Sequence, residues 1–337
     1  MAMKFWVVVL GVIVAGGCAR AQGWVPSAGH RQVAIWPGAG PDAQVAAGPE
    51  IVVTTGAKDF VAGRSWASVE DVSVATMTVY SPPKGRNTGA AVVVFPGGGY
   101  EVLAMDLEGT EVCDWLTARG VTCVLLKYRV PGEKPYVGAA YPKAGPYPES
   151  PIALEDAQRT MGLVRLHAKE WGIDPHKVGV LGFSAGGHLV AAISNHFDRR
   201  LYRKVDAADE LSCRPDFGVA VYPGHLSLSA AKWDATQGVK KFPLKIPAGA
   251  GELSLNPDLK VTKNTPPQFL LQAEDDHEDN VDDALAYYLA LKNAGVPTEL
   301  HLYAKGGHAF GLRHTKDAIT DWPGLVDVWM KSLGMVP

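Results

Sequence analysis

The sequence predicts an α/β fold in which helices cover both faces of a mostly parallel central sheet. Short apolar runs recur from about residue 72 to the C-terminus, and they lack the strict alternation typical of a sheet with one solvated face. Segments with helical spacing of apolar residues separate these runs. Strands that alternate with helices form parallel sheets, whose ligands bind beyond the carboxyl ends of the strands.

Each predicted element carries a local signal. Val72–Tyr80 is β-branched and alternates, which is typical of a strand, and apolar residues three and four apart predict a helix over Glu108–Arg119. Further strands are predicted over Ala90–Phe95, Val121–Lys127, Val178–Phe183, Phe217–Tyr222, Phe269–Ala273 and Glu299–Tyr303. Further helices are predicted over Ile152–Trp171, Ala185–Asn195, Val281–Ala294 and Asp317–Leu333.

The N-terminus has the layout of a secretory signal peptide over residues 1–21. A basic start at Lys4 is followed by an apolar run and by the small-x-small site Ala19-Arg20-Ala21. We expect cleavage after Ala21 and a secreted or periplasmic protein. The alternative is a lipoprotein anchored through Cys18, because Ala15-Gly16-Gly17-Cys18 is similar to a lipobox. The apolar run is too short to span a bilayer as a helix of the mature chain.

The remainder divides into two parts. Residues 22–65 are rich in Ala, Gly and Pro, and we expect an extended segment that wraps the domain surface. Residues 66–337 are expected to form one α/β domain, in which the weakly periodic stretch 223–266 is a candidate cap or lid.

Net charge and cysteine content indicate which partners are excluded and whether disulfides are expected. A net charge of −3 without a long basic run argues against a nucleic-acid partner. Cysteines occur at positions 18, 113, 123 and 213, so cleavage of the signal would leave three. An odd count argues against a full disulfide framework. Cys113 and Cys123 could pair, but we predict that both are free, buried thiols.

The sequence Gly182-Phe183-Ser184-Ala185-Gly186 follows a predicted strand and precedes a predicted helix. This is the setting of a nucleophile elbow, in which a strained turn exposes the serine hydroxyl. Glycines are required because side chains would clash in so tight a turn. Ser184 is therefore the candidate nucleophile; a plain glycine-rich turn is the alternative.

A second glycine-rich segment, Phe95-Pro96-Gly97-Gly98-Gly99-Tyr100, follows the strand that ends at Phe95. Acyl transfer to a serine requires two N–H donors for the oxyanion. We expect one from Ala185 and the other from Gly98 or Gly99. The alternatives are a flexible turn and a phosphate cradle, but neither phosphate-binding glycine motif is present.

Gly306-Gly307-His308-Ala309-Phe310-Gly311 follows the last predicted strand. His308 is the candidate general base because the histidine comes last in the chain order Ser, acid, His. The rivals are His188, expected to be a packing residue on the helix after Ser184; His301, inside a strand; and His314, expected on the surface.

The acid comes from Glu274-Asp275-Asp276-His277-Glu278-Asp279, after the Phe269–Ala273 strand. A carboxylate there would orient His308, and we choose Asp276, with Asp275 next. The remaining acids are expected to cap the helix that begins near Val281. A metal site of clustered acids is the alternative, but it lacks a convincing set of partner ligands.

These residues resemble the α/β-hydrolase superfamily from about Val72 to the end, and more specifically bacterial exported esterases grouped with acetylxylan and feruloyl esterases. The segments that carry the resemblance are Ile35-Trp36-Pro37-Gly38, Pro96–Tyr100, Leu107-Glu108-Gly109, Leu126–Arg129, Gly182–His188 and Gly306–Gly311. The resemblance implies that the second Asp of Ala273-Glu274-Asp275-Asp276 is the triad acid. Two departures are Pro96, where lipases have His, and Asp279-Asn280, where relatives often have Val-Pro.

The resemblance implies hydrolysis of small acyl groups, acetyl first, on plant-polysaccharide sugars. Catalysis through Ser184 and His308 would require no metal or cofactor. We expect a small-molecule or polysaccharide ester as substrate, with Tyr100 and Glu108 as candidate substrate-binding residues. Tyr136, Tyr141, Tyr147 and Trp233 would stack on sugars or pack in loops. The alternatives are a feruloyl esterase, a short-chain carboxylesterase or lipase, a serine peptidase, and a non-catalytic carbohydrate-binding protein on the same fold.

Overall fold

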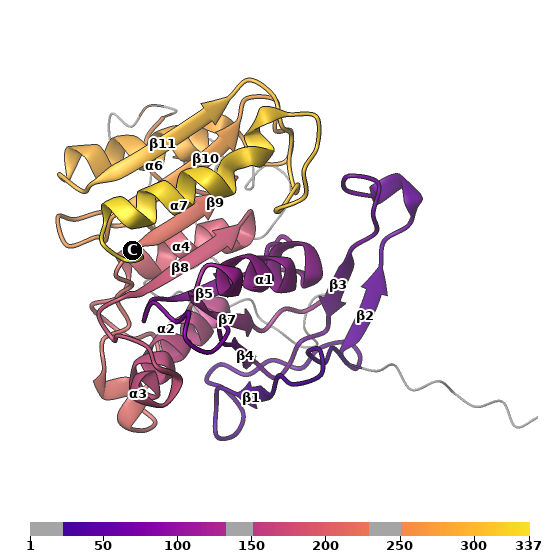
Figure 1. Cartoon of the computed structure of the whole chain (residues 1–337), viewed down its shortest axis with the longest axis vertical. Coiled ribbons are helices and arrows are strands. Elements are labelled where there is room, and N and C mark those ends of the chain that lie inside the picture. Colours follow the sequence, from indigo (N-terminus) through magenta and orange to yellow (C-terminus); the bar gives the residue numbers. More distant parts are fainter. Residues whose placement is uncertain (1–22, 133–150, 229–250, 252) are drawn as a thin grey trace, which may run out of the picture.

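An eight-stranded sheet lies at the centre of the computed structural model, which describes residues 23–132, 151–228, 251 and 253–337 (Figure 1). The strand order is β1-β4-β7-β5-β8-β9-β10-β11. β1 and β4 are antiparallel to their neighbours, and the strands from β7 to β11 pair in parallel. Their bounds are β1 Gln32–Ala34, β4 Thr76–Tyr80, β5 Ala91–Phe95, β7 Thr122–Lys127, β8 Val178–Phe183, β9 Gly218–Val221, β10 Gln268–Ala273 and β11 Thr298–Tyr303.

The five inner parallel strands, from β7 to β10, are buried along their whole length. Helices on both faces exclude water, and apolar side chains are therefore favoured at every position instead of every second one. This burial explains the continuous apolar runs of the sequence and confirms the predicted fold class.

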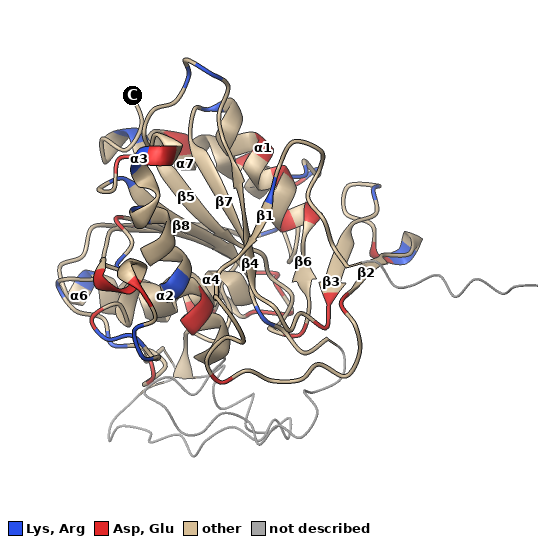
Figure 2. Ribbon diagram, turned by 90° about the horizontal axis from the view of Figure 1, so that it is seen from below, with Lys and Arg blue, Asp and Glu red and all other residues tan. Residues whose placement is uncertain are grey.

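The helices form a layer on each side of the sheet. Figures 1 and 2 show α1 and α7 on one face and α2, α4 and α6 on the other. Their bounds are α1 Glu111–Ala118, α2 Pro151–Leu166, α3 Ala168–Trp171, α4 Ala185–Asn195, α6 Val281–Asn293 and α7 Trp322–Ser332.

Three predicted helices differ in detail. The helix predicted over 108–119 begins instead as a π-helical turn, Asp106–Thr110, before α1. The helix predicted over 152–171 is broken at His167, whose φ and ψ of −94° and 8° leave the helical region. The helix predicted over 317–333 starts with a 3₁₀ turn, Ala318–Asp321, before α7.

The N-terminal segment contains strands that local patterns did not reveal. β1 extends the main sheet, while β2 (Ile51–Thr54) pairs with β3 (Ala67–Glu70) and β3 with β6 (Leu103–Ala104) in a separate antiparallel sheet. Figure 1 shows this small sheet beside the main one. Several sequence expectations fall outside the described residues, namely the signal peptide, Tyr136, Tyr141, Tyr147 and Trp233, and most of the candidate cap. Within the described ranges, none of the helices has the length and apolarity that crossing a bilayer requires.

The prediction of free thiols at Cys113 and Cys123 is wrong. The two residues form a disulfide between α1 and β7, with their Cα atoms 5.1 Å apart. α1 packs against β7, and this contact brings together two buried positions that are ten residues apart in the chain. Cys213 is a free, buried thiol.

Candidate active site

Ser184 lies at the sharp turn between β8 and α4, as the sequence predicts. Its φ of 51° and ψ of −119° are strained values for a residue with a side chain. A Cβ on Gly182 would come within 2.1 Å of the Gly186 carbonyl oxygen, and one on Gly186 within 2.1 Å of the Phe95 carbonyl oxygen. The two glycines therefore permit the close packing that holds Ser184 at the end of the strand.

His308 and Asp276 are brought together by the loops that follow β11 and β10. His308 Nδ1 lies 2.7 Å from Asp276 Oδ2. The other carboxylate oxygen accepts hydrogen bonds from the backbone N–H groups of Glu278 and Asp279. The Gln272 side chain donates to Oδ2 over 3.0 Å. These contacts fix the buried carboxylate in the orientation that addresses the imidazole.

The charges around His308 favour its protonated form. Burial on its own would lower the pKa of the imidazole, but the hydrogen bond and negative charge of Asp276 outweigh it. Asp279 and Glu108 add to the effect, and the pKa is raised above its ordinary value of 6.5. Because its pKa is raised, the neutral form of the imidazole is a stronger base.

Asp275, the alternative candidate for the triad acid, contacts the backbone of the His308 loop instead of the imidazole ring. Its Oδ1 accepts the backbone N–H groups of Gly306 and Gly307, over 2.9 and 2.8 Å. These hydrogen bonds, led by the one from Gly307, lower the pKa of Asp275. The carboxylate therefore ties down the loop that carries His308, and Asp276 contacts the ring itself.

Asp279 is the site residue that the sequence reading missed. It was expected to cap α6, but Asn280 is the N-cap, its side chain accepting from the Asp282 backbone N–H. The Ser184 hydroxyl instead donates to Asp279 Oδ2 over 3.3 Å, and the same oxygen lies 3.7 Å from His308 Nε2. The available signal was the departure at positions 279 and 280 from the Val-Pro that the family resemblance often implies, because it puts a carboxylate in place of an apolar residue.

The Pro96–Tyr100 loop lies next to Ser184 and has the properties of an oxyanion site. Gly98 has a φ of 127°, and a Cβ there would come within 2.2 Å of the Val102 carbonyl oxygen. Among the described residues, the N–H groups of Gly98 and Gly99 have no acceptor. Ala185 opens α4, where N–H groups lack intrahelical partners. These donors are suited to bind a negatively charged oxygen.

Glu108 lies behind this loop rather than on its surface. With 2% of its surface exposed, it accepts hydrogen bonds from the Gly97 N–H over 2.7 Å and the Tyr222 hydroxyl over 2.8 Å. Burial raises the pKa of Glu108, although its hydrogen bonds and His308 oppose the shift. In this position Glu108 supports the loop from beneath, and its expected contact with substrate stays a prediction.

Tyr100 and the rival histidines lie at defined places. The half-buried Tyr100 shares a 2.6 Å hydrogen bond with Nδ1 of the fully buried His188. His301 in β11 stacks on Phe269, and His314 is exposed. Within the described chain, no group of three or more His, Cys, Asp or Glu side chains is arranged to hold a metal ion.

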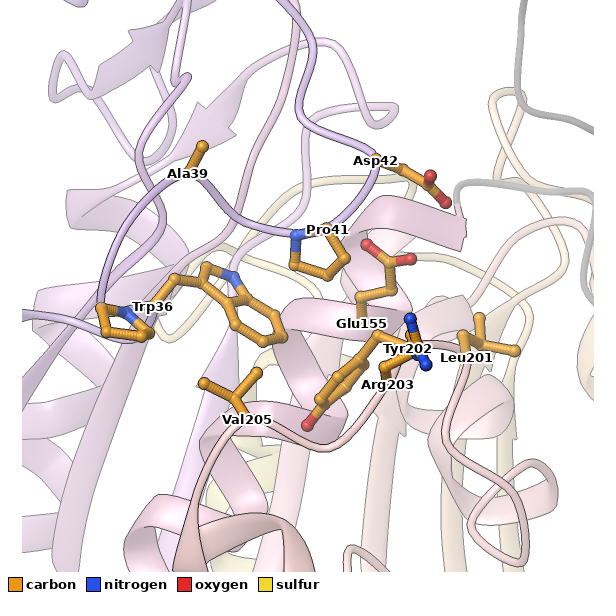
Figure 3. A pocket seen from close by; sticks show the side chains of 10 residues that line it. Trp36, Ala39, Pro41, Asp42, Glu155, Leu201, Tyr202, Arg203 and Val205 are labelled. Atoms are coloured by element: carbon orange, nitrogen blue, oxygen red, sulfur yellow. The ribbon is translucent and has the colours of Figure 1, made fainter.

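A hollow of about 460 Å³ lies elsewhere on the surface, between the N-terminal segment and the chain after α4 (Figure 3). The rings of Trp36 and Tyr202 meet there at 88°. Burial raises the pKa of Glu155 at its edge to about 8, against the opposing charge of Arg129. The hollow is lined by Trp36, Pro37, Ala39, Pro41, Asp42, Glu155, Leu201, Tyr202, Arg203 and Val205. It contains neither Ser184 nor His308 and is a separate feature.

Comparison with known proteins places the chain in a family. The chain is 31% identical over 250 residues to an acetylxylan esterase of Xylanibacter ruminicola, covering 72% of this chain and 45% of that protein. It therefore spans less than half the length of this relative. An ethyl acetate hydrolase of Pseudomonas putida is 25% identical over 72% of this chain and 75% of its own length.

The solved structures agree with this assignment. An acetyl ester-xyloside bifunctional hydrolase from Caldicellulosiruptor lactoaceticus superposes with a TM-score of 0.65 at 30% identity, covering 91% of this chain and 97% of its own. Residues 92–312 match the family model described as the alpha/beta hydrolase fold, and the chain belongs to this α/β-hydrolase family.

Proposed function

We propose that the protein is a serine esterase that removes short acyl groups, acetyl first, from sugars of plant cell-wall polysaccharides or oligosaccharides. The observation that carries the proposal is the juxtaposition of Ser184 and His308. Both contact the same Asp279 oxygen, and Asp276 holds the far side of the His308 ring. Acyl transfer through serine requires a nucleophile, a base and an acid close together. Here they come from three separate loops at the ends of strands.

In the proposed reaction, His308 Nε2 takes the proton of the Ser184 hydroxyl as Oγ attacks the ester carbonyl. The oxyanion is stabilised by the N–H groups of Ala185 and of Gly98 or Gly99. His308 then gives its proton to the departing alcohol oxygen, which leaves an acyl-enzyme. Water, activated by His308, attacks the acyl carbon and releases the carboxylic acid and Ser184.

The relatives support the choice of substrate. One is named as an acetylxylan esterase, another as an ethyl acetate hydrolase, and the superposed structure as an acetyl ester-xyloside hydrolase. A short acyl group is common to all three names. The signal-peptide pattern of residues 1–21 supports export of the chain, which would bring the enzyme to polymers outside the cell.

The serine assignment is tested by Ser184→Ala, with Ser81→Ala at an exposed position as the matched control. We expect Ser184→Ala to lower turnover of p-nitrophenyl acetate by at least about 1,000-fold without loss of folding, and to abolish labelling by a fluorophosphonate probe. The Ser81 variant should retain both. Equal labelling of wild type and Ser184→Ala would refute the assignment.

The substrate assignment is tested by release of acid from acetylated xylan, feruloylated sugar and triglyceride. We expect the highest kcat/KM on acetylated xylan. Preference for the feruloyl ester or for triglyceride would identify a feruloyl esterase or a lipase using the same residues. Binding of xylan without turnover of any ester would instead indicate a carbohydrate-binding protein.

A further inference from the structure

The carboxylate of Asp279 lies beside the two atoms between which the serine proton passes, Ser184 Oγ and His308 Nε2. Its Oδ2 is 3.3 Å from Ser184 Oγ and 3.7 Å from His308 Nε2. In acyl transfer through serine, the leaving oxygen takes its proton from this imidazole nitrogen. The carbon attached to that oxygen is therefore close to Asp279, and a substituent on the next carbon is within reach of the carboxylate.

The loop holds Asp279 in this position through its backbone. Its N–H donates to Asp276 Oδ1 over 3.1 Å, and its carbonyl accepts from the Gln272 side chain over 2.9 Å. On the other side, a Cβ on Gly224 would come within 2.1 Å of Asp279 Oδ1. A residue with a side chain at 224 would push the carboxylate away, so the fold makes specific room for it.

The carboxylate of Asp279 is largely buried, and it therefore needs hydrogen-bond donors from its neighbours or from substrate. Its side chain is 15% exposed, and burial raises its pKa, while the imidazoles of His308 and His225 partly oppose the shift. An ionised carboxylate only accepts hydrogen bonds. Once Ser184 has given up its proton, it no longer donates to Asp279; an alkyl group there would leave the carboxylate without that donor, whereas a hydroxyl would replace it.

We propose that Asp279 is a specificity-determining residue that accepts a hydrogen bond from a hydroxyl on the carbon next to the esterified one, so that the enzyme selects esters of polyols and sugars over esters of simple alcohols. The inference rests on the proposed esterase function and adds to it a contact to the alcohol half of the ester. A carboxylate that only oriented His308 would act on all esters alike, and the two roles are therefore separable.

The experiment compares two substrates in each enzyme. One is a methyl xyloside with a single acetyl group and a free hydroxyl on the neighbouring carbon; the other lacks only that hydroxyl. The measured quantity is the ratio of their kcat/KM values, in which any change common to both substrates cancels. For wild type we expect a ratio of about 10 to 100, the range for one hydrogen bond to a charged group.

In Asp279→Ala the ratio should fall to within about threefold of one. Glu278→Ala removes the same charge from an exposed position on the same loop and should keep the wild-type ratio. If the alanine variant does not fold, Asp279→Asn replaces it. That variant keeps one carbonyl acceptor but loses the charge, so its ratio should fall by about threefold or more.

A wild-type ratio near one would overturn the inference while leaving an active esterase. So would an unchanged ratio in the Asp279 variants, with both substrates slowed equally, because that result would assign Asp279 to positioning His308. Absence of turnover of p-nitrophenyl acetate and of fluorophosphonate labelling in wild type would overturn the esterase function, and the inference with it.

Discussion

Oδ2 of Asp276 lies 2.7 Å from His308 Nδ1, and Oδ1 of the same carboxylate accepts two backbone N–H groups. The acid therefore cannot turn away without breaking several hydrogen bonds. We expect Asp276→Asn to lower kcat for p-nitrophenyl acetate by about 1,000- to 10,000-fold, because an amide N–H facing Nδ1 favours the wrong imidazole tautomer. Steady-state kinetics of the folded variant would measure this.

Asp275→Asn is the matched control on the adjacent residue. Its side-chain carbonyl can still accept the N–H groups of Gly306 and Gly307, and the loop of His308 should keep its place. We expect a fall in kcat of less than about tenfold, because the two hydrogen bonds are weakened by loss of the charge but are not lost. A fall as large as that of Asp276→Asn would contradict this division of roles, because it would make the Asp275 carboxylate as necessary to the base as Asp276.

Glu108→Gln is expected to lower kcat for p-nitrophenyl acetate by about 10- to 100-fold, with little change in KM, by displacing an oxyanion donor. Both Gly97 N–H and Tyr222 O–H donate to the Glu108 carboxylate. A glutamine offers a single oxygen, so one donor would face an NH₂ group and the glycine loop would shift. A variant that raised KM and left kcat unchanged would instead support the original expectation of a substrate contact.

The sequence was sufficient to predict the parallel core of the sheet and to select Ser184, Asp276 and His308, which the structure brings close together. Continuous apolar runs predicted the buried strands β5, β7, β8, β9 and β10, because full burial removes alternation. The turn around Ser184 was readable because strand, glycine spacing and helix are all local signals. His308 followed from its place after the last strand.

Contacts between segments that are far apart in the chain could not be predicted from local sequence patterns. β1 is only three residues long and pairs with β4 more than forty residues later, and no local pattern specifies such a partner. The burial of Glu108 beneath the glycine loop could not be predicted, since it depends on a contact with Tyr222 in a different part of the chain. Asp279 was assigned to the helix cap because acidic residues are common there, whereas packing against Gly224 directs it to Ser184.

The pH dependence of kcat/KM should follow His308. The base must be neutral to accept the serine proton, so activity is lost as pH falls through the pKa of His308. That pKa is raised by Asp276, Asp279 and Glu108 despite burial, and the acidic limb should lie above 6.5. Asp279→Asn removes one of these charges and should move the limb to lower pH.

The pH dependence is checked by rate profiles for wild type and Asp279→Asn on p-nitrophenyl acetate, whose leaving group has no neighbouring hydroxyl. Glu278→Ala serves as the control for loss of a charge on the same loop. A limb that moved to higher pH in Asp279→Asn would contradict the electrostatic account, because removal of a nearby negative charge cannot favour the imidazolium.

The disulfide between Cys113 and Cys123 joins α1 to β7, which is a central strand of the sheet. Closing a loop of this size reduces the conformational entropy of the unfolded chain, and the expected stabilisation is about 2–3 kcal/mol. We expect Cys113→Ser/Cys123→Ser to lower the free energy of unfolding by about this amount, plus the cost of burying two hydroxyls without fixed partners. Chemical denaturation would measure it.

Reductant provides the control that separates the bond from the buried hydroxyls. Dithiothreitol added to the wild type should lower its stability, whereas the double variant should not respond, and Cys213→Ser should keep the response because Cys213 is a free thiol. Two results together would contradict the disulfide: no loss of wild-type stability on adding dithiothreitol, and detection of free thiols at positions 113 and 123 in protein that has not been reduced. Since α1 and β7 lie beside the strand that leads into the glycine loop, loss of the bond should also raise hydrogen exchange at Gly97, whose N–H donates to Glu108, before global unfolding.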